Sequence, residues 1–167
     1  MATTSTIAVV HQDNSVSQVY CHWDGYLSWN GKFLMQHYPL LHCAEELVSF
    51  GDISSLRENI HPEDPMSVHD FDNNQKNVCV YYGRDRGEED VATRKFKDIQ
   101  EFLDNRLEQE YDYIYYGDRW YLMVVDGKEK THLFEVTQDL IEQSEKEAFV
   151  WYLEKAIGNN EPKLLTA

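Results

Sequence analysis

Two strand–turn–strand patterns constrain the fold of this chain more than any other feature. Residues 6–11 and 16–22 are rich in strand-forming side chains and flank Asp13-Asn14-Ser15, residues that favour turns because their side chains bond nearby backbone. Residues 111–116 and 120–125 repeat the pattern across Gly117-Asp118, and residues 132–136 follow another short turn. Connections this short join antiparallel neighbours, so the sequence predicts an antiparallel sheet.

Helical patterns occupy much of the remaining chain. They cover residues 32–38, 42–50, 98–109 and 137–157, with Thr137 as the N-cap of the last helix. Residues 77–82 form another apolar strand pattern, and residues 53–72 carry two prolines and several acids and are expected to be mostly irregular. We therefore predict a single α+β domain over residues 1–167, with about six strands packed against three or four helices.

The net charge limits the classes of partner that this protein can bind. The chain has 30 Asp and Glu residues against 15 Lys and Arg, a formal net charge of −15. Such a surface repels a nucleic-acid backbone or an anionic membrane, so we expect no direct nucleic-acid binding and no membrane binding. Basic proteins, cations and imitation of a nucleic acid remain open.

The cysteines and the N-terminus indicate the compartment. Cys21, Cys43 and Cys79 are odd in number and lack the spacing of a disulfide framework. The first residues lack the basic start and apolar run of a signal peptide, and no stretch approaches the ~20 apolar residues of a membrane span. A soluble cytoplasmic protein with free thiols is expected.

The segment Tyr20-Cys21-His22-Trp23-Asp24-Gly25-Tyr26 concentrates chemically versatile side chains. A cysteine nucleophile needs a base within hydrogen-bond reach. Cys21 and His22 point to opposite faces of a strand, so a dyad would need His37 or His42 from elsewhere. The alternative is a buried Cys21, an edge His22 and a turn at Asp24.

Several of these residues are also possible zinc ligands. Cys21, His22, His37, His42 and Cys43 have suitable donor atoms, but no Cys-x2-Cys or His-x3-His pair is present, and His37 and His42 are five positions apart. Pro39 would break a helix shared by His37 and His42. We expect no metal and no cofactor.

Basic residues gather in one stretch. Arg84, Arg86, Arg94, Lys95 and Lys97 place five of the 15 basic residues within fourteen positions. Arginines in a Gly-flanked turn suit phosphate, and nearby aromatics could stack on a base. The candidate ligand residues are Tyr20, His22, Trp23, Asp24, Tyr26, Arg84 and Arg86. The interleaved acids favour the alternative of a self-paired surface loop.

Six aromatic residues lie within residues 111–121: Tyr111, Tyr113, Tyr115, Tyr116, Trp120 and Tyr121. With a period of two, Tyr111, Tyr113 and Tyr115 share one sheet face. They could form a stacking platform, but packing within the sheet explains them more simply.

Acidic residues recur along two predicted helices. The candidate partner-binding residues are Asp98, Glu101, Asp104, Glu108, Asp139, Glu142 and Glu145. Such spacing usually marks a solvated helix face. Carboxylates on rigid elements can also reproduce part of the potential of duplex DNA, which would require a basic groove on the partner.

Several segments resemble one family of proteins. The segments are Ser5-Thr6-Ile7-Ala8, YCHWDGY at 20–26, Gly31 with Leu34, His37-Tyr38, GDISSL at 51–56, YGRDRG at 82–87 and GDRWY at 117–121. Over roughly residues 5–121 this pattern resembles small, mostly uncharacterised acidic accessory proteins of tailed bacteriophages. The resemblance implies a phage protein acting in the host cytoplasm, and it implies no reaction.

We therefore expect a non-enzymatic phage accessory protein that binds and inhibits a host protein through an acidic surface. The expected target is a nucleic-acid-handling defence system, of the kind met by anti-CRISPR or anti-restriction proteins. One alternative is a binder that sequesters a nucleotide signal with the arginines and aromatics. A second is a small enzyme that uses Cys21 and His22.

Overall fold

The N-terminal hairpin forms as expected. In this computed structural model, which describes residues 1–167, β1 (Ser5–Val10) and β2 (Val16–Cys21) pair antiparallel from Ser5↔Cys21 to Val10↔Val16. Asp13 accepts hydrogen bonds from the backbone nitrogen and the hydroxyl of Ser15, and Asn14 adopts a left-handed conformation with φ 68°. The predicted turn chemistry is therefore confirmed.

The second hairpin is also confirmed. β6 (Tyr111–Tyr116) and β7 (Arg119–Val125) pair antiparallel, and β8 (Thr131–Glu135) follows on the other side of β7. Gly117 and Asp118 both have positive φ, 56° and 68°, as the tight turn between twisted strands requires.

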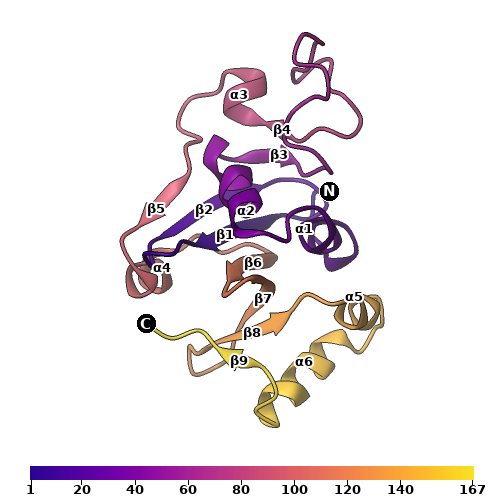
Figure 1. The fold of residues 1–167 in the computed structure, drawn as a ribbon. Coiled ribbons are helices and arrows are strands. Elements are labelled where there is room, and N and C mark those ends of the chain that lie inside the picture. Colours follow the sequence, from indigo (N-terminus) through magenta and orange to yellow (C-terminus); the bar gives the residue numbers. More distant parts are fainter.

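The sheet is larger than predicted and is not wholly antiparallel. It has nine strands rather than six, in the order β4-β3-β2-β1-β6-β7-β8-β9, with β5 paired to β2 (Figure 1). The strands that the sequence did not indicate are β3 (Ile53–Ser55), β5 (Arg94–Phe96) and β9 (Lys163–Leu164). β1 runs parallel to β6, and β2 runs parallel to β3. The α+β class is confirmed, and the strand number is corrected.

The first face of the sheet is covered by helices from both halves of the chain. A π-helical turn (Leu27–Gly31) leads into α1 (Lys32–His37), and Pro39 separates α1 from α2 (Leu41–Leu47). Side chains from β1, β2 and β6 pack there against Leu34, Leu47 and Leu140 in the larger core cluster. The predicted helices around Pro39 are thus confirmed, and α2 continues as a short 3-10 turn (Val48–Phe50) before Gly51.

The opposite face is covered by α4 (Ile99–Asn105) and by the C-terminal tail. Ile99 and Phe102 pack on alternate side chains of the central strands, together with Leu165. Asp98 caps the helix by accepting from the Glu101 nitrogen, and the Glu101 carboxylate accepts from the nitrogen of Lys97, the residue before the cap. α4 ends at Asn105 rather than residue 109 because the chain then extends along the sheet, where Leu107 bonds Gln18.

The C-terminal helix is two helices rather than one. Thr137 caps α5 (Gln138–Ser144) as predicted, and the chain turns at residues 145–148 before α6 (Phe149–Gly158). At ~100° per residue, a continuous helix would place Leu140 and Phe149 about half a turn apart. The break lets the apolar residues of both helices pack on the same core.

The YGRDRG segment is a helix rather than a loop. The strand predicted at 77–82 shortens to β4 (Val80–Tyr81), and α3 (Tyr82–Arg86) begins directly after it. Gly87 ends α3 in the left-handed conformation, with φ 75°. Before β4, residues 56–79 are irregular apart from an isolated bridge between Asn59 and Val78, so the predicted irregular segment extends further than residue 72.

Candidate functional site

The YCHWDGY segment divides between the two faces of the sheet. Tyr20 and His22 lie on the face of α4, where the Tyr20 hydroxyl and His22 Nδ1 are 2.7 Å apart. The Trp23 ring meets the His22 ring edge-on with centroids 4.7 Å apart, and Trp23 is 44% exposed. These three side chains form a continuous, partly exposed aromatic surface.

The end of the segment is held by packing. Gly25 donates from its nitrogen to the Thr3 carbonyl (2.8 Å), and its own carbonyl accepts from the Tyr113 hydroxyl (2.7 Å). A Cβ on Gly25 would lie 2.7 Å from the Thr4 carbonyl oxygen, so only glycine fits. Asp24 accepts from the Tyr26 hydroxyl (3.2 Å). This part of the segment therefore joins the N-terminus to the core.

Cys21 is not placed to act as a nucleophile. Its side chain is fully buried, opposite His22, and Asn30 Nδ2 donates to its sulfur at 3.4 Å. Burial raises the pKa of the Cys21 thiol to about 12, so the thiol stays protonated at neutral pH. Cys21 and His22 therefore form no dyad, as their alternation along the strand predicts.

The other histidine and cysteine candidates do not gather around Cys21. His37 and His42 are exposed on α1 and α2, and Cys43 packs against the core, with its Sγ 3.5 Å from Nε2 of its neighbour His42. The structure contains no group of three or more His, Cys, Asp or Glu side chains arranged to hold a metal ion. The three cysteines are all free.

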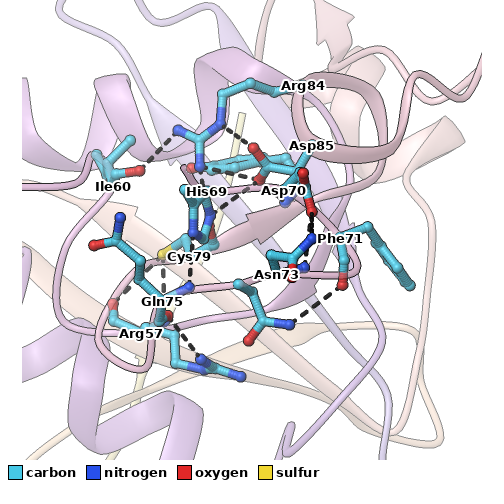
Figure 2. Close-up of polar contacts among 12 residues, drawn as sticks. Arg57, Ile60, His69, Asp70, Phe71, Asn73, Gln75, Cys79, Arg84 and Asp85 are labelled. Carbon is cyan, nitrogen blue, oxygen red and sulfur yellow. Dashed lines mark hydrogen bonds and ion pairs between the residues drawn. The ribbon is translucent and has the colours of Figure 1, made fainter. Parts of the chain in front are cut away.

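Arg84 is bound by the protein itself. Its guanidinium donates from Nη1 to the Ile60 carbonyl (2.7 Å), from Nη2 to the Cys79 carbonyl (2.9 Å) and from Nε to Asp85 Oδ1 (2.9 Å) (Figure 2). It also lies over the Tyr81 ring, 4.7 Å from the centroid. With these bonds made, Arg84 is not free to bind a phosphate.

His69 completes the buried network. Its Nδ1 accepts from the Gln75 nitrogen (3.0 Å), and its Nε2 lies 2.9 Å from the Cys79 carbonyl and 3.5 Å from Asp85 Oδ2 (Figure 2). Asp85 also accepts from the Tyr81 nitrogen. These bonds fasten the irregular segment before β4 to α3, which is a structural role that the sequence did not indicate.

Of the seven candidate ligand residues, Arg84 is therefore excluded from a shared phosphate site. Arg86 is half exposed and lies over the Phe71 ring, 4.6 Å from the centroid, whereas Tyr20 binds His22 and Asp52. No polar contact joins either arginine to the aromatic surface of Tyr20, His22 and Trp23. Arg84 cannot bind a phosphate beside these aromatics, because it binds inward.

The aromatic stretch at 111–121 is mostly core. Tyr113, Tyr115, Trp120 and Tyr121 are buried, and the hydroxyl of Tyr115 and the indole nitrogen of Trp120 donate to the backbone carbonyls of Pro39 and Tyr38. Tyr111 and Tyr113 share a face, with stacked rings 6.5 Å apart. The packing interpretation is confirmed, and no exposed stacking platform exists there.

The acidic residues do not form one surface either. α4 and α5 cover opposite faces of the sheet, so Asp104 lies far from Glu142 in the fold. Asp98 and Glu101 are occupied in capping α4, and Glu108 lies beyond the helix, 3.2 Å from Arg106 Nη2. Of the candidate acidic residues, only Asp139, Glu142 and Glu145 lie together, on α5 and at its C-terminal end.

We call the exposed side chains of residues 135–161 the α5–α6 surface. Its seven acidic residues are all exposed: Glu135, Asp139, Glu142, Glu145, Glu147, Glu154 and Glu161. Lys146 and Lys155 are its only basic residues, so seven negative and two positive charges give a local net charge of −5. Figure 1 shows both helices beside β8 and β9, at one end of the sheet.

Two apolar residues on the α5–α6 surface were missed by the sequence analysis. Val150 and Trp151 are 68% and 61% exposed, and the Lys155 ammonium lies 4.8 Å from the Trp151 ring centroid. The inward positions of α6 are taken by Phe149, Tyr152, Leu153 and Ala156. The sequence contained a signal for this exposure, because the helical periodicity of α6 places Val150 and Trp151 outside the apolar face formed by the inward residues.

Comparison with known proteins adds no relatives. No protein-family model matches the chain, and no curated protein or solved structure matches it either. None of the helices has the length and apolar character needed to cross a bilayer.

Proposed function

We propose that this protein is a phage accessory protein that binds and inhibits a host protein through the α5–α6 surface. The observation that carries the proposal is the exposed Trp151 beside Val150 on a surface with a local net charge of −5. Negative charge steers a basic partner into contact, and a tryptophan contributes a large share of binding energy when it becomes buried.

A nucleic-acid-handling protein of the host cytoplasm fits this surface best. Its groove is built to bind about one negative charge per ~1.7 Å of duplex, so carboxylates on rigid helices can occupy it in place of DNA. The resemblance of residues 5–121 to phage accessory proteins supports this partner class. The protein acts here by binding, with no reaction required.

The test uses defence nucleases of restriction and CRISPR type, each bound to labelled duplex DNA. The protein is expected to displace DNA from one of them at low salt and to lose that effect near molar salt. Trp151→Ala is expected to weaken displacement by tenfold or more, on the order of 2 kcal/mol for a buried anchor.

A charge-matched control separates local contact from total charge. The pair Glu142→Gln with Glu145→Gln removes two charges from α5, and Asp104→Asn with Glu108→Gln removes two from the opposite face. The α5 pair should weaken displacement, and the control pair should not. Equal effects of the two pairs, or displacement of no nuclease, would contradict the proposal.

A further inference from the structure

A hydroxyl, an imidazole and a carboxylate form a chain of hydrogen bonds beyond the turn of the N-terminal hairpin. Ser17 Oγ lies 2.8 Å from His11 Nε2, and His11 Nδ1 lies 2.5 Å from Glu45 Oε2. The three residues come from β2, from the position after β1 and from α2, so the fold and not local sequence brings them together. The binding function proposed above does not use them.

The order of the three groups suits activation of the serine. In the tautomer that carries its proton on Nδ1, the His11 ring donates to Glu45 and Nε2 accepts from the Ser17 hydroxyl, which leaves Nε2 ready to take the hydroxyl proton. Serine becomes reactive in this arrangement, because the carboxylate orients the base and the base contacts the nucleophile.

The hydrogen-bonded side chains of Ser17, His11 and Glu45 line a pocket of about 480 Å³. Lys95 on β5 is the register partner of Ser17, and side chains of directly opposed residues share one face of a sheet. Lys97 and Thr93 also line the pocket. In a chain with a net charge of −15, this pocket has basic residues on one wall, which favours a substrate with a negative charge.

We propose that this pocket is an acyl-hydrolase site for anionic acyl esters, with Ser17 as nucleophile, His11 as general base and Glu45 as a positioning residue. Ser17 Oγ attacks the acyl carbon while its proton passes to His11 Nε2. The tetrahedral intermediate collapses, the ester C–O bond breaks, and His11 returns the proton to the leaving alcohol. Water then releases the acyl group from Ser17 by the same steps, and Lys95 stabilises the oxyanion and the substrate carboxylate.

The first test is covalent labelling with a fluorophosphonate, followed by mass spectrometry of the intact protein and its peptides. The Ser17 oxygen forms the bond to phosphorus as fluoride leaves, so one adduct is expected, on Ser17. Ser17→Ala should abolish it. Ser15→Ala is the matched control, because Ser15 lines the same pocket but its hydroxyl binds Asp13.

The second test is hydrolysis of the p-nitrophenyl monoester of succinate, compared with p-nitrophenyl butyrate. The wild type should prefer the anionic ester by tenfold or more, and Lys95→Met should remove most of that preference. Glu45→Gln should lower kcat by tenfold or more and leave KM nearly unchanged, because the amide no longer orients and charge-stabilises the His11 imidazole while it holds the hydroxyl proton. A merely structural Glu45 would change KM and thermal stability together with kcat.

Circular dichroism and thermal unfolding of each variant check that it is folded before activity is compared. Labelling elsewhere than Ser17, equal hydrolysis by wild type and Ser17→Ala, or no reaction with either probe would overturn the proposal. None of these measurements involves a protein partner, so failure here leaves the DNA-displacement test unaffected.

Discussion

Gln18 and Leu107 are joined by two hydrogen bonds across 89 positions of sequence. Gln18 Nε2 donates to the Leu107 carbonyl, and the Leu107 nitrogen donates to Gln18 Oε1, both at 2.9 Å. The side-chain amide thus pairs with the backbone as a neighbouring strand would, although Leu107 belongs to no strand. This contact directs the chain from α4 back onto the sheet before β6.

Replacing Gln18 with leucine should destabilise the fold by about 2 kcal/mol, because two backbone groups of Leu107 lose their partners. Chemical denaturation measures the free energy of unfolding. Gln36→Leu is the control, since Gln36 is exposed on α1 and should change stability by less than about 0.5 kcal/mol. Similar losses for the two variants would show that the Gln18 contact contributes nothing particular.

Gly25→Ala should destabilise the protein by about 1–3 kcal/mol, since its Cβ would meet the backbone of Thr4, which has little room to shift. Thermal unfolding provides the comparison with Gly158→Ala, whose Cβ would meet no atom within 4 Å. The control should be neutral or slightly stabilising because alanine favours helix. A neutral Gly25→Ala would contradict the packing role given to the YCHWDGY segment.

Arg84 and Arg86 should behave differently although they lie two residues apart. Arg84→Met leaves buried Asp85 without its cation and should cost about 3 kcal/mol, with faster hydrogen exchange across residues 57–79. Arg86→Met should cost less than about 0.5 kcal/mol, because Arg86 is half exposed and its nearest carboxylate oxygen is 3.9 Å away. If hydrogen exchange changes equally in both variants, the network around Arg84 is not what holds this segment.

Asp126 should stabilise the fold only above acidic pH. Hydrogen bonds from His132 and from the Lys130 and Lys128 nitrogens lower the pKa of Asp126 to about 2, from 3.8. A carboxyl whose pKa is lower in the folded state stabilises fully above the unfolded value and loses that contribution as pH falls from about 4 to 2. Wild type should therefore exceed Asp126→Asn in stability at pH 6, and the gap should close towards pH 2. A gap that is constant with pH would exclude this ionisation as the cause.

The local parts of the fold could be predicted from sequence, because turns and caps depend on neighbouring residues. Gly117 and Asp118 supply the positive φ of a hairpin, and Thr137 caps α5, each within a few positions. The parallel pairing of Ser5 with Tyr111 depends on residues more than a hundred positions apart, and no local pattern encodes it. A two-residue strand such as Lys163–Leu164 is too short to show periodicity.

The candidate site was harder to predict for the same reason. Its residue type made Arg84 a possible phosphate ligand. Its guanidinium instead donates to the carbonyls of Ile60 and Cys79, which lie in a segment without regular structure, so no sequence pattern indicated these bonds. Ser17, His11 and Glu45 are common surface residue types, and only the placement of α2 beside the hairpin brings them together. Trp151 was the exception, since its position outside the apolar stripe of α6 was visible in the sequence.

The place of β1 at the middle of the sheet sets the order in which the protein can be assembled during synthesis. β1 and β2 leave the ribosome early, but the second edge of β1 has no partner until β6, about 90 residues after β2, has been made. Closing so long a loop is slow, and an open central strand meanwhile exposes unpaired backbone groups. The emerging chain is therefore most vulnerable to wrong pairing and to proteolysis before residue 116 is released, and its folding is completed late.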